Sequence, residues 1–218
     1  MDQLTIVQKI SVWVLPILFA VTLHEAAHGY VAYKLGDDTA FKAGRITLNP
    51  LKHIDPIGTI VVPLILMLST SFIFGWAKPV PIDPNKLKNP KTDTAWVAFA
   101  GPFSNFLMAI FWVGVLKIGL MLFQFKFHFG VALVYMGQAG MMINLVLLVL
   151  NLIPIPPLDG SRVFASLLPT PWDQKYNQLA PFGFIIVLLL LVAGILSKFL
   201  YPPVLWLQQL LLAIFQLT

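Results

Sequence analysis

The sequence has no cysteine and few charged residues. None of its 218 residues is a cysteine, which excludes a disulfide framework and a thiolate metal site. Charged residues make up 11% of the chain, whereas an ordinary soluble domain has about 25%. Hydrophobic residues reach 58%, and the mean hydropathy is +0.84. This composition indicates an integral membrane protein.

The positive charge is spread thinly along the chain. The net charge is +5 at pH 7, and its lysines are scattered through short connectors, which suits loops beside anionic lipid. We therefore expect contact with the bilayer and no nucleic-acid partner. The N-terminal hydrophobic segment lacks a convincing small-residue cleavage site, so we expect it to be retained in the mature protein.

Several apolar runs approach the roughly 20 residues that a helix needs to span a bilayer. They predict an all-α polytopic membrane protein, a bundle of about five or six transmembrane helices. We expect one membrane-embedded domain over residues 1–218, with a catalytic core at about 8–165 and accessory C-terminal helices at about 181–217. The predicted spans are 8–34, 57–74, 94–123, 131–152 and 183–200, and a shorter helix at 204–217 either crosses or lies in the interface.

The connectors are short, and two of them could pair as strands. Residues 41–48 read as a short β-strand or hairpin, and the apolar run 57–74, which contains Pro63, either crosses the membrane or dips in and returns. We expect these membrane-associated connectors, 38–48 and 75–83, to be able to hold an extended peptide by β-augmentation.

The first apolar run is interrupted by the sequence HEAAH at residues 24–28. Ionisable groups at bilayer depth are costly, so they indicate function by default. On a helix, positions i and i+4 share a face, so His24 and His28 can bind one Zn²⁺. Glu25 follows the first ligand and can act as a general base. The alternative is a helix whose polar groups are satisfied inside a bundle.

A catalytic zinc site usually has three protein ligands, so the pattern requires a third. The candidates include His53, Asp55, His128 and Asp159. Asp159 ends the segment NLIPIPPLDG, where prolines prevent a regular helix, and irregular backbone near membrane depth is tolerated where it is buried or lines a wet cavity. We therefore predict Asp159 as the third ligand. The alternative is a turn residue, because Asp-Gly is a common turn pair.

We predict different roles for the other two histidines. His53 either braces its connector or approaches the metal as an auxiliary ligand. His128 lies among phenylalanines and a lysine, which is typical of an anchor at the membrane interface.

Small and amide residues recur at helical spacing along the fourth predicted span: Gly137, Gly140, Asn144 and Asn151. In the third span, Gly101 and Asn105 also share a face. Small residues let helices approach closely, and buried amides need partners. We therefore expect these faces to meet the helix that carries HEAAH, either as part of the site or as interhelical hydrogen bonds alone.

HEAAH in a membrane span, followed by AGPFSN and NLIPIPPLDG, resembles the site-2 protease family of intramembrane zinc metalloproteases (peptidase family M50). The connector NPLKHIDPIG is similar to that of the compact prokaryotic subgroup without a PDZ domain. The resemblance implies that His24, His28 and Asp159 bind one zinc ion per chain and that Glu25 activates water. It further implies that Asn105 and Asn151 position substrate or stabilise the oxyanion.

By this resemblance the protein hydrolyses peptide bonds within or next to transmembrane segments of substrate proteins in a prokaryotic cell membrane. One alternative function is a divalent-metal transporter that uses the HExxH helix. Another is a catalytically inactive membrane scaffold, against which the intact Glu25 argues. Nothing in the sequence indicates an oligomeric state.

Overall fold

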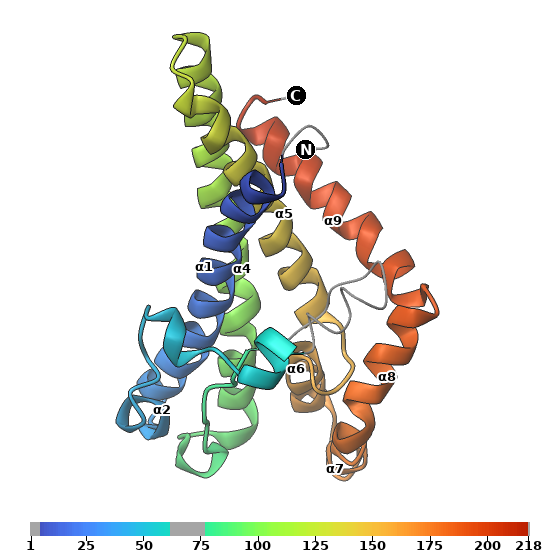
Figure 1. Cartoon of the computed structure of the whole chain (residues 1–218). Helices are drawn as coiled ribbons and strands as arrows, with labels where there is room; N and C mark the ends of the chain where they lie inside the picture. Colours follow the sequence, from blue (N-terminus) through green and yellow to red (C-terminus); the bar gives the residue numbers. More distant parts are fainter. Residues whose placement is uncertain (1–4, 62–76, 218) are drawn as a thin grey trace.

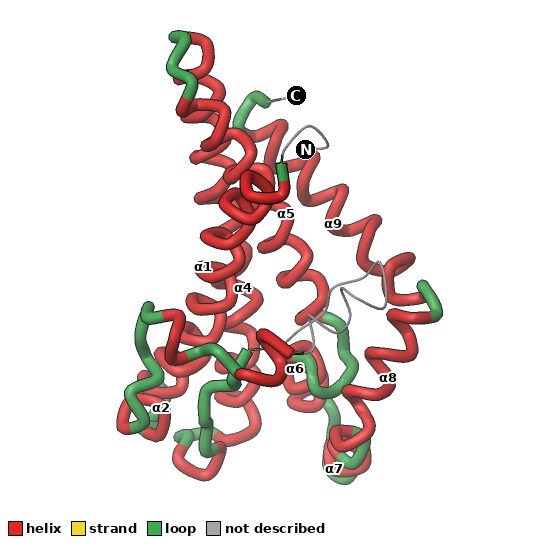
Figure 2. Tube along the Cα trace, viewed as in Figure 1, coloured by secondary structure: helices red, strands yellow, loops and turns green. Residues whose placement is uncertain are grey.

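The computed structural model describes residues 5–61 and 77–217, and within these ranges the chain consists of helices and loops without a strand (Figures 1 and 2). The long helices are α1 (Ile6–Lys34), α4 (Pro90–Gln124), α5 (Phe129–Leu152), α8 (Ala180–Val192) and α9 (Ile195–Ile214). The short ones are α2 (Thr39–Lys42), α6 (Asp159–Leu167) and α7 (Trp172–Asn177), with 3₁₀ turns at Pro50–Lys52 and Pro84–Lys86 and a π-helical turn at Pro56–Val61.

Local sequence signals define where the first two long helices begin. Thr5 and Gln8 form a reciprocal capping box at the start of α1, which satisfies two backbone donors that a helix end leaves unpaired. Pro90 occupies the first turn of α4, where its missing N–H costs nothing. The carboxylate of Asp93 accepts a hydrogen bond of 2.8 Å from the amide of Asn89, which precedes the helix.

Helices α1, α4 and α5 lie side by side and form the centre of the molecule (Figure 1). Gly137 of α5 allows a close approach, because a Cβ atom there would lie 2.6 Å from the backbone nitrogen of Leu116 in α4. Gly140 faces the ring of Trp112 in the same way. The largest buried apolar cluster includes residues of α4, α5 and α9: Ala109, Trp112, Val113, Met141, Leu145, Leu148, Val204 and Leu211.

Three helices in the described part of the chain are long and apolar enough to cross a membrane: Val7–Lys34, Pro90–Gln124 and Phe129–Leu152. The 24 residues of the shortest span about 36 Å at 1.5 Å per residue, which exceeds the roughly 30 Å of a bilayer core. Large apolar side chains point outward along them, for example Ile10, Phe111 and Ile118, each more than half exposed. Such surfaces are suited to lipid. The predicted helices at 8–34, 94–123 and 131–152 are thus confirmed.

The prediction of a strand or hairpin over 41–48 is wrong. Residues Thr39–Lys42 form α2, and turns and bends follow as far as the next 3₁₀ turn. The chain turns instead of pairing because Gly44 adopts a left-handed φ of 63°, a conformation that glycine tolerates at little cost. The apolar run 57–74 is described only up to residue 61, and the rest of that predicted span lies outside the described residues.

The boundary between the last two predicted helices is also wrong. The prediction separated a span at 183–200 from a helix at 204–217, but α9 runs without a break through Pro202 and Pro203. The chain instead bends by 80° between α8 and α9, at Gly194, whose φ of 69° lies in the left-handed region. A residue with positive φ is a common end of a helix, whereas Pro202 and Pro203 lie inside α9 without ending it. If the bent pair counts as one span, the described residues hold up to four.

Candidate metal centre

Helix α1 presents His24 and His28 one turn apart, on the face that looks into the bundle. Both residues are buried, with relative exposures of 9% and 6%. Their Nε2 atoms are 3.1 Å apart, and the rings meet edge to face with centroids separated by 4.6 Å. Because the two histidines are four residues apart on α1, both imidazoles point toward the same position.

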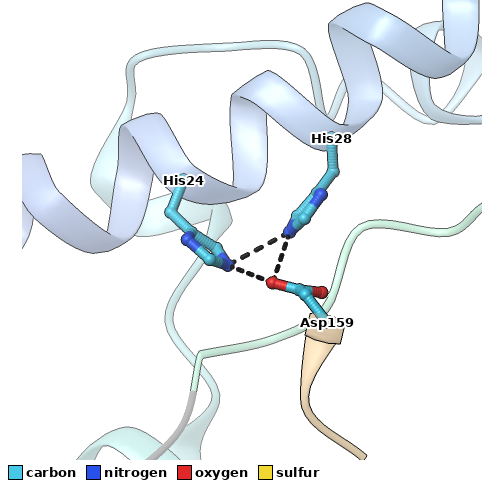
Figure 3. A group of neighbouring side chains, drawn as sticks. All are labelled: His24, His28 and Asp159. Carbon is cyan, nitrogen blue, oxygen red and sulfur yellow. Dashed lines mark hydrogen bonds and ion pairs between the residues drawn. The ribbon is translucent and has the colours of Figure 1, made fainter. Parts of the chain in front are cut away.

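Asp159, the first residue of α6, completes a triangle with these two rings (Figure 3). Its Oδ2 atom lies 3.1 Å from Nε2 of His24 and 3.3 Å from Nε2 of His28. The prolines that precede it keep residues 153–158 out of helix, so the chain leaves α5, turns, and starts α6 with this carboxylate facing α1. The structure thus brings together the three residues that the sequence predicted as ligands.

The hydrogen bonds of the two rings determine where their lone pairs point. Nδ1 of His28 lies 2.7 Å from the carbonyl oxygen of Val97, an acceptor only, so Nδ1 carries the hydrogen. Nδ1 of His24 lies 2.7 Å from Oδ1 of Asn105, and the same reasoning applies. In a neutral imidazole the other nitrogen is then an acceptor. Both Nε2 lone pairs therefore face Oδ2 of Asp159, a buried atom without a hydrogen-bond donor among the described residues.

Three converging lone pairs repel one another unless a cation lies between them, and the dimensions of the triangle fit zinc. Zinc bonds to histidine nitrogen and carboxylate oxygen are about 2.0–2.2 Å long, and tetrahedral geometry then places ligand atoms about 3.3–3.6 Å apart. The three edges here measure 3.1, 3.1 and 3.3 Å. Within the described residues, His24, His28 and Asp159 form the one group of this kind that can hold a metal ion.

Helix α4 packs against the two histidine rings. Gly101 lies directly against both imidazoles, and a Cβ atom at this position would be 2.5 Å from Cε1 of His28 and 2.6 Å from Cε1 of His24. The expectation that the small face of the third span meets the HEAAH helix is confirmed. Gly101 is required here because any side chain would push the two rings out of place.

Asn105 lies one helical turn beyond Gly101 and is fully buried. Its amide group donates to the carbonyl oxygen of Ala20 at 3.2 Å and to Oδ1 of Asn144 at 2.9 Å, and Asn144 in turn donates to Gly140 at 2.8 Å. With both hydrogens of Asn105 engaged and its oxygen on His24, this side chain orients the imidazole. Such partners fix ring orientation and tautomer in metal sites.

A cavity of about 440 Å³ opens beside the triangle. It is bounded by α1, the segment after residue 76, the end of α5 and α6, and its wall includes Glu25, Asn151 and Arg162. Glu25 accepts a hydrogen bond of 2.9 Å from the amide of Val80. Asn151 donates to the carbonyl oxygen of Leu147 at 3.0 Å. The predicted base and one of the two predicted oxyanion donors thus share one cavity with the triangle.

His53 lies within its own connector and contacts the backbone there. It is buried, and its Nε2 atom lies 3.0 Å from the carbonyl oxygen of Thr47 in the same connector. It is absent from the group that can hold a metal. Of the two readings of His53, this geometry favours the brace of the connector over the auxiliary ligand.

Sequence reasoning missed the two backbone groups that contact the site. The carbonyl of Val97 fixes His28, and the amide of Val80 contacts Glu25. Every residue carries these groups, so no residue type reveals their role. The one sequence feature that pointed to the Val80 amide was the pair of prolines at 79 and 81, because these prolines restrict the backbone around Val80.

Comparison with known proteins agrees with this geometry. The sequence profile of peptidase family M50 matches residues 124–191, which contain Asp159 and Asn151. A protein of Bacillus subtilis named "Putative zinc metalloprotease YwhC" is 40% identical over 197 residues, covering 87% of this chain and 84% of that protein. "Putative zinc metalloprotease Rip2" of Mycolicibacterium smegmatis is 28% identical over 211 residues, covering 94% of this chain and 77% of that protein. No solved structure matches the chain.

An identity of 40% along most of both chains, together with apolar helices long enough to span a membrane, establishes the relationship. The chain is a membrane metalloprotease that belongs to peptidase family M50, the site-2 protease family.

Proposed function

We propose that this chain is an intramembrane zinc endopeptidase, which hydrolyses peptide bonds within or next to the transmembrane segments of other membrane proteins. One observation carries the proposal: the buried triangle of His24, His28 and Asp159 lies on the same cavity as the carboxylate of Glu25. The names of the relatives support zinc and proteolysis. The position of the triangle on a membrane-length helix supports cleavage at membrane depth.

In this proposal His24, His28 and Asp159 hold one zinc ion per chain. When bound, zinc supplies Lewis acidity, which lowers the pKa of water to about 7 and polarises the scissile carbonyl. The carboxylate of Glu25 accepts the proton of the attacking water and returns it to the leaving amine. The amide of Asn151 faces the cavity and donates to the developing oxyanion, an interaction worth roughly 3–4 kcal/mol.

The surroundings of the site support one class of substrate. The triangle is enclosed by helices whose outer faces are apolar, so a peptide reaches it from the bilayer rather than from bulk water. Substrates are therefore transmembrane segments, which unwind locally to expose a carbonyl. Since the two relatives named above are bacterial proteins, we place the chain in a prokaryotic cell membrane. The catalytic core at 8–165 and the C-terminal helices act as one domain.

A divalent-metal transporter is the alternative function. A transporter needs ligands spaced along a path across the membrane. Helix α5 contains no charged residue and no histidine, and the described residues gather their possible ligands in one group. This arrangement favours a single catalytic centre over a conduction path.

Two substitutions test the proposed function. Glu25→Gln keeps the shape of the side chain but removes the base, so it should retain zinc and capture uncleaved membrane proteins, identified by mass spectrometry after cross-linking. A captured single-span protein, tagged at both ends, then serves as the reporter of cleavage.

The wild-type protein should cut this reporter, Glu25→Gln should not, and His24→Ala should lose both zinc and cleavage. Proteolysis that survived Glu25→Gln would refute the role of Glu25. Zinc flux into vesicles that survived it would favour the transporter.

A further inference from the structure

The segment 77–83, which we name the strap, contacts the site through a single backbone group. The amide of Val80 donates to Oε2 of Glu25 over 2.9 Å. It is the one hydrogen bond that Glu25 makes to the residues described here. Val80 is itself buried, with 7% of its surface exposed, and strap and carboxylate line the same cavity. A carboxylate on a rotatable side chain is thereby held in one orientation by one donor.

The side chain of Val80 packs against α1 at Gly29. Gly29 lies one helical turn after Glu25, and a Cβ atom at Gly29 would be 3.2 Å from Cγ1 of Val80. The absence of that atom leaves a notch that the valine occupies. Val80 therefore holds the strap against α1 through two contacts. Its side chain packs at Gly29, and its amide donates to Glu25.

Two connections hold the first part of the strap from outside the cavity. The amide of Lys78 donates to the carbonyl oxygen of His53 at 2.9 Å. A guanidinium nitrogen of Arg45 donates to the carbonyl oxygen of Lys78 at 2.7 Å. Charge-assisted hydrogen bonds of this kind are stronger than neutral ones. Arg45 and His53 thus fix the residue that lies two positions before Val80.

Arg45 has an unusual position for a structural cation. It is buried, with 7% of its surface exposed, and it makes no ion pair in the described part of the chain. A buried charge without an opposite charge is costly. The guanidinium instead donates to the strap carbonyl of Lys78, so Arg45 is placed to hold the strap.

The far end of the strap is held by Asp37. This residue is fully buried, and its carboxylate accepts from the amide of Asp83 at 2.7 Å and from the amide of Thr39 at 2.9 Å. Burial raises the pKa of the Asp37 carboxyl, but the hydrogen bonds from Thr39 and Asp83 and the charge of Lys86 outweigh burial and lower the pKa below its usual range. Asp37 therefore stays ionised as an anchor.

The sequence of the strap makes it stiff. Proline at 79 and 81 fixes two φ angles, and a residue that precedes proline is biased toward extended conformations. Val80 therefore has a restricted backbone between two anchors. The prolines also leave positions 79 and 81 of the strap without amide donors.

We propose that the strap positions Glu25: the amide of Val80 orients the carboxylate, and Arg45 fixes the strap through the Lys78 carbonyl. The proposal rests on the proposed function, because it assigns the way in which the base of that reaction is oriented. Val80 and Arg45 are positioning residues in this scheme. Their loss lowers the rate of the bound complex and leaves zinc binding intact.

An amide-to-ester replacement at Val80, introduced by nonsense suppression, removes the N–H donor and keeps the side chain. With the doubly tagged reporter, kcat should fall at least tenfold, while KM and zinc content stay within twofold of wild type. The control is the same replacement at Asn85, whose amide donates to Asp83 at an exposed turn, and it should leave kcat unchanged. Equal kcat values for the two esters would overturn the proposal.

A measurement on zinc-free protein tests the contact without catalysis. The Val80 ester should lower the thermal unfolding midpoint in the wild-type background and have no effect when Glu25 is replaced by alanine. An ester effect of equal size in both backgrounds would mean that the donor does not act on Glu25, and this would overturn the proposal.

Arg45 gives a second variant pair. Arg45→Met keeps much of the length without the donor, and it should lower kcat at least fivefold with zinc content and KM unchanged. Arg45→Lys keeps a cationic donor and should restore most of the loss. If Arg45→Met keeps wild-type kcat, or if Arg45→Lys is as impaired as Arg45→Met, the proposal fails. If the wild-type protein loaded with zinc cuts none of the captured reporters, the proposed function itself fails.

Discussion

Gly101→Ala is the substitution for which the structure gives the clearest expected magnitude. The added Cβ would lie 2.5 Å from Cε1 of His28 and 2.6 Å from Cε1 of His24, whereas ordinary contact begins at 3.4 Å. One or both rings must therefore move by about 0.9 Å. Ligand distances in metal sites tolerate only about 0.2 Å. We expect the zinc affinity to fall at least 100-fold, which corresponds to about 2.8 kcal/mol.

The assay is competition for zinc with a chelating fluorophore on purified protein in detergent. Gly114→Ala is the matched control, because it lies on the same helix and its added Cβ meets no atom within 4 Å. Alanine is favoured over glycine in a helix by up to about 1 kcal/mol, so both variants should fold, as circular dichroism will show. If Gly101→Ala binds zinc as tightly as Gly114→Ala, α4 does not pack against the two rings and the geometry of the site is incorrect.

Three further predictions follow from single contacts. Asn105→Leu should lower zinc affinity by about 10–100-fold because His24 loses its orienting partner, and an unchanged affinity in the same competition assay would contradict this role. Asp37→Asn should lower the unfolding midpoint at neutral pH, because the folded pKa of Asp37 is depressed and its stabilisation is fully present above the unfolded pKa of about 3.9; the deficit relative to wild type should shrink as the pH falls below that value, and a deficit that does not shrink would count against it. Gly194→Ala should destabilise the protein by about 1–2 kcal/mol because φ is positive there, measured by unfolding against Gly114→Ala; equal stability of the two would mean that the left-handed turn is not needed.

Much of the site was predictable because its information is in residue types. Two histidines four positions apart on a helix and an aspartate behind three prolines are sufficient to predict a metal triangle, and the structure places their ligand atoms 3.1–3.3 Å apart. The long helices were predictable for a similar reason, since an apolar run of membrane length has few other conformations open to it.

The remainder depends on features that one sequence does not display. A carbonyl such as that of Val97 and an amide such as that of Val80 act through the backbone, which every residue shares. The bend after α8 depends on the positive φ of Gly194, which the sequence does not display. By helix propensity alone, Pro202 and Pro203 would be expected to break the helix more strongly than Gly194. The strand predicted at 41–48 is absent because α2 and the left-handed turn at Gly44 occupy this stretch, and Arg45 holds the connector to Lys78.

The most direct test of the account is the location of zinc in crystals of the chain, from anomalous diffraction at the zinc edge. The account predicts one strong peak per chain, about 2.0–2.2 Å from Nε2 of His24, Nε2 of His28 and an oxygen of Asp159. A zinc peak elsewhere, or one bound by the two histidines with Asp159 turned away, would contradict it.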